Sequence, residues 1–368
     1  MIIGVPKEIK NNEYRVGLIP DSVKDLTLSN HNVIVQEGAG LGVGYSDQDY
    51  ANAGAEIVSK DCVFAYSNLI VKVKEPQLDE INLLNKDQIL FTYLHLAPDL
   101  QQTNQLIDSQ ACCIAYETIR DRYNNLPLLA PMSEIAGRMS IQAGAQALEK
   151  VSGGSGVLLG GVPGVSSGKV VILGAGTVGL NAAKMAVGLG ADVTIMDINL
   201  NLLRKIDNIF GSRVKCLYSN YSSITNLIAD ADLVIGGVLI PGAAAPKLVT
   251  EDHIKSMKDG SAVVDVAIDQ GGCFETSIAT THENPTYVKY GVIHYCVANI
   301  PGAVAKTSTH ALNNATMPYI LKLANNGIAA LKSDEGFLKG LNVFNGHVTC
   351  KEVAESLGLS YTDPLSLV

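Results

Sequence analysis

Residues 170–197 constrain the fold more than any other part of this chain. They read VVILGAGTVGLNAAKMAVGLGADVTIMD: an apolar strand, a turn with three spaced glycines, an amphipathic helix, and a second strand that ends on a carboxylate. In such a turn Gly174 permits a sharp bend, Gly176 lets bare backbone approach a pyrophosphate, and Gly179 lets the helix lie close to the sheet. The segment therefore predicts a strand–helix–strand unit that binds a dinucleotide, with phosphates at the helix amino terminus.

The acid at the end of the second strand, Asp197, discriminates between dinucleotides. A carboxylate here accepts hydrogen bonds from the adenosine ribose hydroxyls and repels a phosphate on the ribose 2′ position. The next residues, Ile198 and Asn199, offer no cation to such a phosphate, although Arg204 lies near enough in sequence to reach round. The sequence therefore favours NAD over NADP. The alternative to dinucleotide binding is that residues 170–197 form an ordinary strand–helix–strand turn that binds no ligand.

Length and composition limit the class of protein. A chain of 368 residues exceeds what one hydrophobic core usually serves, so two domains are expected. Its seven cysteines contain no CxxC pair and are expected to be reduced, as in the cytoplasm. No apolar run approaches the roughly 18 residues of a membrane span, and the amino terminus does not read as a secretory signal. The net charge of −9 without a basic stripe argues against nucleic-acid partners, and no residues show metal-ligand spacing.

Short apolar runs alternate with helical patterns, which predicts parallel sheets covered by helices. The expected strands form two sets, 2–5, 33–36, 69–73, 89–94 and 113–116, then 170–173, 193–196, 233–235, 262–266 and 293–296. A helix is expected over 133–151, with Ser133 as its N-cap, and another over 308–325. The predicted fold class is α/β with two Rossmann-like parallel-sheet domains. The nucleotide domain (129–305) is inserted into a discontinuous first domain (1–128 and 306–368).

Candidate catalytic groups stand where apolar runs end. Lys74, His95, Glu117 and Asp269 each follow such a run, and ligands of open α/β sheets bind at the carboxyl ends of strands. Lys72 shares a strand face with Lys74 but lies further inside, so Lys74 is the better ligand candidate. If the two sheets meet edge to edge, a cation, an imidazole and a carboxylate face one cleft.

Each of these residues also has a structural interpretation. The lysine could be a solvated charge, the histidine a satisfied residue of the core or its rim, and the aspartate a turn former that bonds its own backbone. Glu117 is expected to be structural.

Several longer stretches of the sequence are similar to those of a known protein family. They include GVPKEIKNNEYRVGLIP, KVKEP, FTYLHLA, AYET, LLAPMSEIAGRMS, GGVPGV, ADLVIGGVLIPGAAAPKLV, DVAIDQGGCFE and CVANIPGAVAKTSTHALNNATMPY, together with the glycine turn. With these stretches in this order, the chain resembles the alanine dehydrogenase family, which also includes the NAD(H)-binding component of proton-translocating transhydrogenase. The resemblance implies that the first domain is the substrate domain.

The resemblance also implies residue roles. Arg15 and Lys74 would hold the carboxylate and the carbonyl oxygen of the substrate, tasks that suit an arginine fork and a lysine point charge. His95 and Asp269 would be the catalytic acid/base pair. The residues implied to bind the cofactor are Ser133, Gly174, Ala175, Gly176, Val178, Gly179, Asp197, Ser219, Val238, Leu239, Ile268 and Asn299.

The implied reaction is the reversible oxidative deamination of L-alanine to pyruvate and ammonia, by hydride transfer from Cα to the nicotinamide C4 of NAD. Glu117 and Tyr116 remain as supports of the site, and the implied assembly is a homohexamer. Three alternatives stay open: an NAD(H)-binding subunit of a transhydrogenase, a non-catalytic NAD-sensing module, and a dehydrogenase for a saccharopine- or lysine-type substrate.

Overall fold

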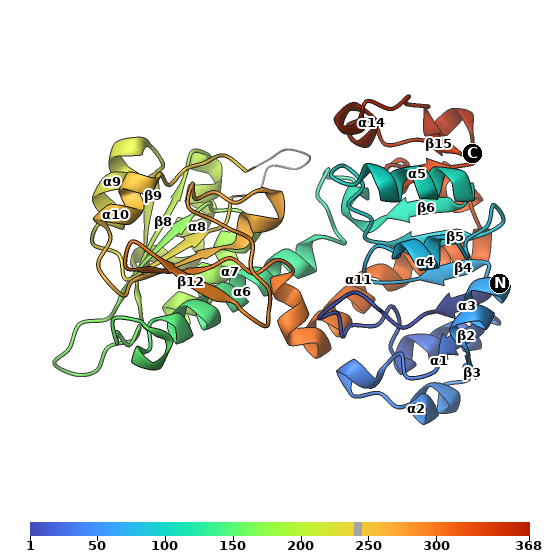
Figure 1. The fold of residues 1–368 in the computed structure, drawn as a ribbon, viewed down its shortest axis with the longest axis horizontal. Coiled ribbons are helices and arrows are strands. Elements are labelled where there is room, and N and C mark those ends of the chain that lie inside the picture. Colours follow the sequence, from blue (N-terminus) through green and yellow to red (C-terminus); the bar gives the residue numbers. More distant parts are fainter. Residues whose placement is uncertain (239–244) are drawn as a thin grey trace. The chain divides into compact units, whose positions relative to one another are not determined.

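The computed structural model describes residues 1–238 and 245–368, which form two compact units (Figure 1). The first unit combines Met1–Met132 with Val304–Val368, and the second unit is Ser133–Ala303. Leu239, one of the residues implied to bind the cofactor, lies outside the described residues.

The first unit is built on an eight-stranded sheet. Its strands, in spatial order, are β15 (His347–Val348), β14 (Leu341–Phe344), β6 (Cys112–Ala115), β5 (Ile89–Thr92), β4 (Leu69–Val71), β1 (Ile2–Val5), β2 (Asn32–Gln36) and β3 (Glu56–Val58). The run from β3 to β6 is parallel and has the spatial order 3-2-1-4-5-6 of a doubly wound sheet. The hairpin β14–β15 adds to β6 in antiparallel fashion.

The helices of the first unit come from both ends of the chain. They are α1 (Pro20–Leu28), α2 (Asp47–Asn52), α3 (Lys60–Tyr66), α4 (Leu78–Ile81), α5 (Leu100–Ser109), α11 (Ala305–Asn326), α12 (Ala329–Lys332), α13 (Glu335–Leu338) and α14 (Lys351–Leu357). Side chains from α5 and α14, such as Leu106 and Val353, share one core with Leu90 of β5. Sequence segments more than two hundred residues apart are thus packed together.

The second unit is built on a seven-stranded sheet. Its strands, in spatial order, are β12 (Thr286–Lys289), β13 (Val292–Tyr295), β11 (Ala262–Asp265), β10 (Leu233–Gly236), β7 (Lys169–Leu173), β8 (Asp192–Asp197) and β9 (Val214–Tyr218). Without the antiparallel edge strand β12, the six parallel strands again follow the doubly wound order. The further helices are α6 (Ala130–Ala147), α7 (Thr177–Gly188), α8 (Leu200–Phe210), α9 (Tyr221–Ile228) and α10 (Glu251–Ser256).

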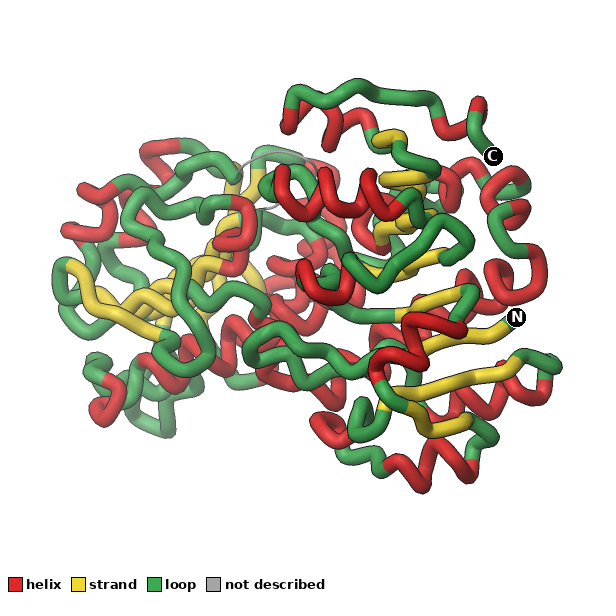
Figure 2. Tube along the Cα trace, turned by 45° about the vertical axis from the view of Figure 1, so that its right-hand side comes forward, coloured by secondary structure: helices red, strands yellow, loops and turns green. Residues whose placement is uncertain are grey.

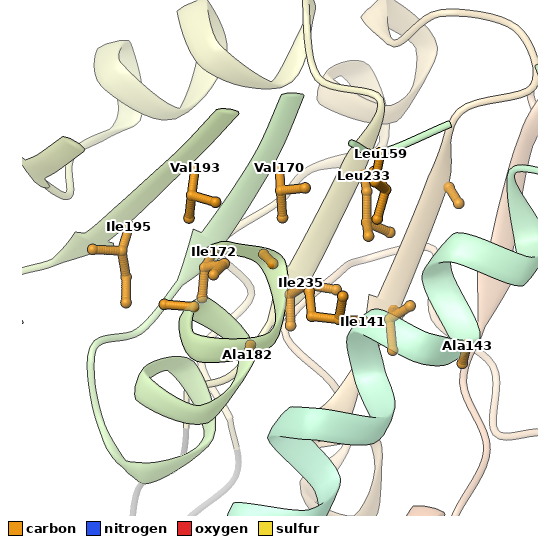
Figure 3. Close-up of a cluster of buried hydrophobic side chains, with 14 of the residues drawn as sticks. Ile141, Ala143, Leu159, Val170, Ile172, Ala182, Val193, Ile195, Leu233 and Ile235 are labelled. Carbon is orange, nitrogen blue, oxygen red and sulfur yellow. The ribbon is translucent and has the colours of Figure 1, made fainter. Parts of the chain in front are cut away.

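Both faces of this second sheet are covered. Val170 and Ile172 of β7 join one hydrophobic cluster, in which Ile141 of α6 and Ala182 of α7 also lie (Figure 3). The alternate residues Val171 and Leu173 join a second cluster on the opposite face. Successive strand side chains point to opposite faces, so this division explains why the strand is apolar throughout. Figure 2 shows the strands of each unit running between helices.

The predicted fold class is confirmed, and each predicted strand is present with small shifts at its ends. The chain turns away from the sheet before residues 73 and 94, so β4 and β5 end earlier than expected. Strands β3, β9, β12, β14 and β15 were not predicted. They are short or lie at sheet edges, where half of the side chains are exposed or a polar residue interrupts the apolar pattern.

The prediction that Ser133 caps a helix is wrong, because α6 already begins at Ala130 and Ser133 lies inside it. Pro131 stands in the first turn, where its missing N–H and fixed φ favour a helix start. The predicted helix over 308–325 is confirmed as α11. Within the described parts of the chain, no helix combines the length and apolarity that a bilayer crossing requires.

Candidate active site

The segments that follow four neighbouring strands of the first unit carry polar groups. Strands β6, β5, β4 and β1 are adjacent and parallel, so the segments that follow them leave the sheet at one edge. These segments bear Glu117, His95, Lys74 and Arg15. Ligands of doubly wound sheets bind at this edge. The topology thus gathers four of the residues that the sequence singled out.

The backbone at His95 adopts a conformation that few side chains tolerate, with φ at +51°. A left-handed residue other than glycine costs about 1–2 kcal/mol. Glu117 stabilises the turn, since its Oε1 accepts the His95 N–H at 2.6 Å and its two oxygens lie 3.2 and 3.3 Å from the Leu94 nitrogen. Oε1 also lies 3.8 Å from His95 Nδ1. Glu117, expected only as a structural residue, therefore holds the backbone on which the imidazole stands.

The imidazole of His95 is accessible and packs against a neighbouring aromatic ring. The His95 side chain is 44% exposed, and its ring stacks on Tyr93 with the planes 3° apart. Tyr93 is buried and its hydroxyl donates to the Leu128 carbonyl at 2.6 Å. Burial raises the pKa of Tyr93, so its phenol remains a neutral donor. A histidine whose ring stacks on a buried tyrosine and whose side chain is still accessible suits proton exchange with a ligand.

Arg15 is buried and its guanidinium is held in place by Glu13. The Nε and Nη2 atoms donate to the two Glu13 oxygens at 2.6 Å each, and Nη1 lies 3.1 Å from the sulfur of Met132. Burial alone would lower the pKa of Arg15, but the hydrogen bonds and charge of Glu13 outweigh it and leave the pKa above its ordinary value. The guanidinium is thus a permanent charge with a fixed plane.

Lys72 and Lys74 have different surroundings. Lys72 is fully buried and its ammonium lies 3.0 Å from Glu80 and 3.3 Å from Glu8. Burial opposes this charge, yet the two carboxylates raise the pKa of Lys72 above its ordinary value. Glu8 also accepts the N–H of Val73 at 2.6 Å. Lys72 is therefore part of the core, whereas the partly exposed Lys74 follows a segment that this buried cluster fixes.

In the second unit the glycine turn leaves backbone open to a ligand. Gly174 has φ at +101°, and a Cβ at Gly179 would lie 1.8 Å from the Gly174 carbonyl oxygen. A Cβ at Gly176 would meet no atom of the described residues within 4 Å, so this glycine is open on the described side of the turn. Gly176 is also the N-cap of α7, and no side chain in the described parts of the chain caps the first amides of that helix. Uncapped amides beside bare backbone fit the pyrophosphate of a dinucleotide.

Asp197 connects the end of β8 to this turn. Its Oδ2 accepts the Ala175 N–H and its Oδ1 accepts the Asn199 N–H, both at 2.7 Å. Each oxygen keeps a lone pair with which it can accept a ribose hydroxyl. Arg204, the one cation considered for a 2′-phosphate, donates instead to Asn201 on its own helix at 2.9 Å. The environment of Asp197 therefore fits NAD.

The other candidate cofactor residues occupy several places in the second unit. Ser133 lies in α6, Ala175 belongs to the glycine turn, and Val178 lies in the first turn of α7. The remaining described cofactor candidates follow the carboxyl ends of parallel strands: Ser219 after β9, Val238 after β10, Ile268 after β11, and Asn299 after β13. The catalytic candidate Asp269 also follows β11. Asp269 is exposed on a short 3₁₀ turn, Val266–Gln270, while Ile268 beside it is buried. Asn299 has φ at +61°.

Sequence reasoning missed three acids that hold these segments: Glu8, Glu80 and Asp265, all buried. The sequence signal available for Asp265 was a carboxylate at the end of an otherwise apolar strand. Nothing in the local sequence marks Glu8 or Glu80 as buried.

A doubly wound unit with an open glycine turn is typical of dinucleotide-binding proteins, and the first unit carries a cation, an imidazole and carboxylates in the segments after its strands. Models of the alanine dehydrogenase/PNT N-terminal and C-terminal domains match residues 4–136 and 140–351. The chain belongs to the alanine dehydrogenase/PNT family.

Individual relatives are similar over their full length. The chain is 57% identical to an alanine dehydrogenase of Methanococcus maripaludis, over 98% of both chains. It is 54% identical to an alanine dehydrogenase of Halomonas elongata, over the whole of both. Its structure is similar to that of an L-alanine dehydrogenase, with a TM-score of 0.95 and 53% identity, covering 97% of this chain and 99% of the other.

A transhydrogenase from Sinorhizobium meliloti has the same fold, with a TM-score of 0.84. The match covers 95% of this chain and all of the other, at 24% identity.

Proposed function

We propose that this chain catalyses the reversible oxidative deamination of L-alanine to pyruvate and ammonia, with NAD as the hydride acceptor. The observation that carries this proposal is the 54–57% identity to alanine dehydrogenases over essentially the whole chain. The transhydrogenase at 24% identity supports the fold alone. The test is NADH formation by the purified protein with a panel of amino acids, and pyruvate reduction with ammonia in the reverse direction. A protein that forms no NADH with alanine and consumes none with pyruvate and ammonia does not have this function.

We propose that the first unit is the substrate unit. Arg15 would bind the substrate carboxylate, because its guanidinium has a fixed plane and a permanent charge. Lys74 would bind the carbonyl oxygen as a point charge. The exposed imidazole of His95 would exchange protons with the substrate and with the water that hydrolyses the imine.

The second unit would be the cofactor unit. The glycine turn, Asp197 and the residues after the parallel strands would hold NAD, whose contribution when bound is to accept the hydride from the alanine Cα. Asp269, exposed after β11, would orient the substrate nitrogen and take a proton from it.

The preference for NAD has its own test. Replacing Asp197 with asparagine removes the charge that repels a 2′-phosphate, a repulsion of about 1–4 kcal/mol at close range. We expect the NAD/NADP ratio of kcat/KM to fall at least about tenfold. Asp207→Asn, which removes an exposed charge further along α8, should leave the ratio unchanged. An unchanged ratio in Asp197→Asn would show that the preference lies elsewhere.

We also propose that the protein works as a homo-oligomer, with the hexamer that the resemblance implies. A small hairpin of the second unit, closed by hydrogen bonds between Val162 and Val165, presents these two valines and Leu158 to solvent, each more than half exposed. Such apolar side chains fit a contact with a second copy. Light scattering should give about six times 38.9 kDa, and Val162→Asp with Val165→Asp should lower that mass. A mass of one chain for the unaltered protein would contradict the proposal.

The cytoplasm is the compartment that we propose. All seven cysteines are free, and five of them are buried. Thiols in this state fit a reducing environment.

A further inference from the structure

Asp265, the last residue of β11, holds the loop that carries Asp269. It is completely buried, and its side chain caps the 3₁₀ turn Val266–Gln270 by accepting the Ala267 N–H on Oδ1 at 3.1 Å. Its Oδ2 accepts from the other side of the loop: from Cys273 N at 2.9 Å, Phe274 N at 3.4 Å and Ser277 Oγ at 2.5 Å. One carboxylate thus bonds to both sides of a loop: to Ala267 where the loop begins and to residues 273–277 where it ends. The exposed Asp269 lies between these two sides.

The loop is shaped around this carboxylate. Gly271 and Gly272 both have positive φ, at +88° and +75°. A Cβ at Gly272 would lie 2.5 Å from Asp265 Oδ2, whereas a Cβ at Gly271 would meet no atom of residues 1–238 or 245–368 within 4 Å. Burial raises the pKa of Asp265, and the surrounding donors oppose that effect. If the loop moved away, the buried charge would lose its donors, which is strongly unfavourable. The position of the loop is therefore coupled to Asp265.

We propose that Asp265 is a positioning residue for the deamination reaction: its buried carboxylate clamps residues 267 and 273 together and so fixes Asp269 where it meets the substrate nitrogen. The inference rests on the role of Asp269 in the proposed function. Asp265 itself contacts no reacting atom and acts through Asp269. The competing interpretation is that Asp265 only stabilises the core of the second unit.

Asp265→Asn tests the clamp. Asparagine has one acceptor oxygen and one amide that cannot accept, so one side of the loop loses its acceptor. Because a displacement of about 1 Å at a reacting group can cost about 10²-fold in rate, we expect kcat for alanine oxidation to fall by about 10- to 100-fold. NADH should still bind, with a loss of affinity smaller than the loss of kcat, because Ile268 is the one candidate cofactor residue on this loop. Ser277→Ala removes one donor but leaves the carboxylate and its three backbone contacts, to Ala267, Cys273 and Phe274, and is expected to change kcat by less than about threefold.

A double-mutant cycle separates positioning from general stability. If Asp265 acts through Asp269, Asp265→Asn should have no further effect on kcat in an Asp269→Asn background. Equal factors in both backgrounds would overturn the proposal, as would full kcat in Asp265→Asn alone. Full activity of Asp269→Asn would instead refute the role of Asp269 in the proposed function, so the two failures are distinguishable.

A second pair of variants serves if Asp265→Asn does not fold. Gly272→Ala places a Cβ against the Asp265 carboxylate, whereas Gly271→Ala introduces similar backbone strain without that contact. We expect Gly272→Ala to lower kcat at least tenfold more than Gly271→Ala, and only when Asp269 is present. Equal kcat values for the two alanine variants would overturn the clamp.

Discussion

Replacing His95 with alanine is expected to lower the turnover of alanine oxidation at least about 100-fold, and Asp269→Asn is expected to do the same. Each variant removes a group proposed to move protons between substrate and solvent, a contribution that is typically worth 10²- to 10⁴-fold. His95 is exposed on a turn fixed by Glu117, so its removal should leave the surrounding backbone in place. NADH should bind to both variants as to the parent, because neither residue is among the candidate cofactor residues. Steady-state kinetics and fluorescence titration with NADH provide the two measurements.

Matched variants control for the loss of a ring or a charge. His347→Ala removes an exposed imidazole from β15, and Asp207→Asn removes an exposed carboxylate from α8. Both should retain turnover. If His95→Ala or Asp269→Asn kept full alanine oxidation, the catalytic role of that residue would be withdrawn.

The second large effect concerns stability. Glu80→Gln is expected to lower the free energy of unfolding by about 3–5 kcal/mol, the typical cost of removing one partner from a buried ion pair. Glu80 and the ammonium of Lys72 are both buried and lie 3.0 Å apart, and among the described residues Glu8 is then the one carboxylate left beside the ammonium. Urea denaturation at fixed protein concentration, followed by circular dichroism, measures the change.

The neighbouring residue on α4 provides the control. Asp79 pairs with Lys60 at 2.7 Å, but its side chain is 64% exposed. An ion pair in contact with water is worth about 0–1 kcal/mol, so Asp79→Asn should barely change the unfolding midpoint. Equal destabilisation by the two substitutions would show that burial of the Lys72 cluster is not what makes it important.

The sequence allowed prediction of those features that depend on local order. The glycine spacing, the carboxylate at Asp197 and the polar residues at strand ends could be recognised because a parallel strand places its carboxyl end at a known edge. The central strands were recognisable because they are buried on both faces and are apolar throughout. The edge strand β9 was missed because three of its five side chains are exposed.

Features that depend on distant residues could not be predicted. The preference for Lys74 over Lys72 rested on position along a strand, whereas the structural reason is that Glu8 and Glu80 surround the Lys72 ammonium. In sequence, both acids look like ordinary surface residues. The left-handed backbone at His95 depends on Glu117, which lies 22 residues further along the chain. Such contacts become visible only after the sheet has brought the segments together.

The division of the first unit between both ends of the chain has a consequence for synthesis on the ribosome. Asn313 of α11 accepts from Ile19 N at 3.1 Å and from Ser22 Oγ at 2.7 Å, and its amide donates to the Gly17 carbonyl. These early residues are translated long before Asn313, so their hydrogen bonds to it cannot form until α11 has been synthesised. The second unit is one uninterrupted segment and emerges complete before Val304. Vectorial folding therefore finishes the second unit first, and the first unit can complete its fold only when the last segment has been made.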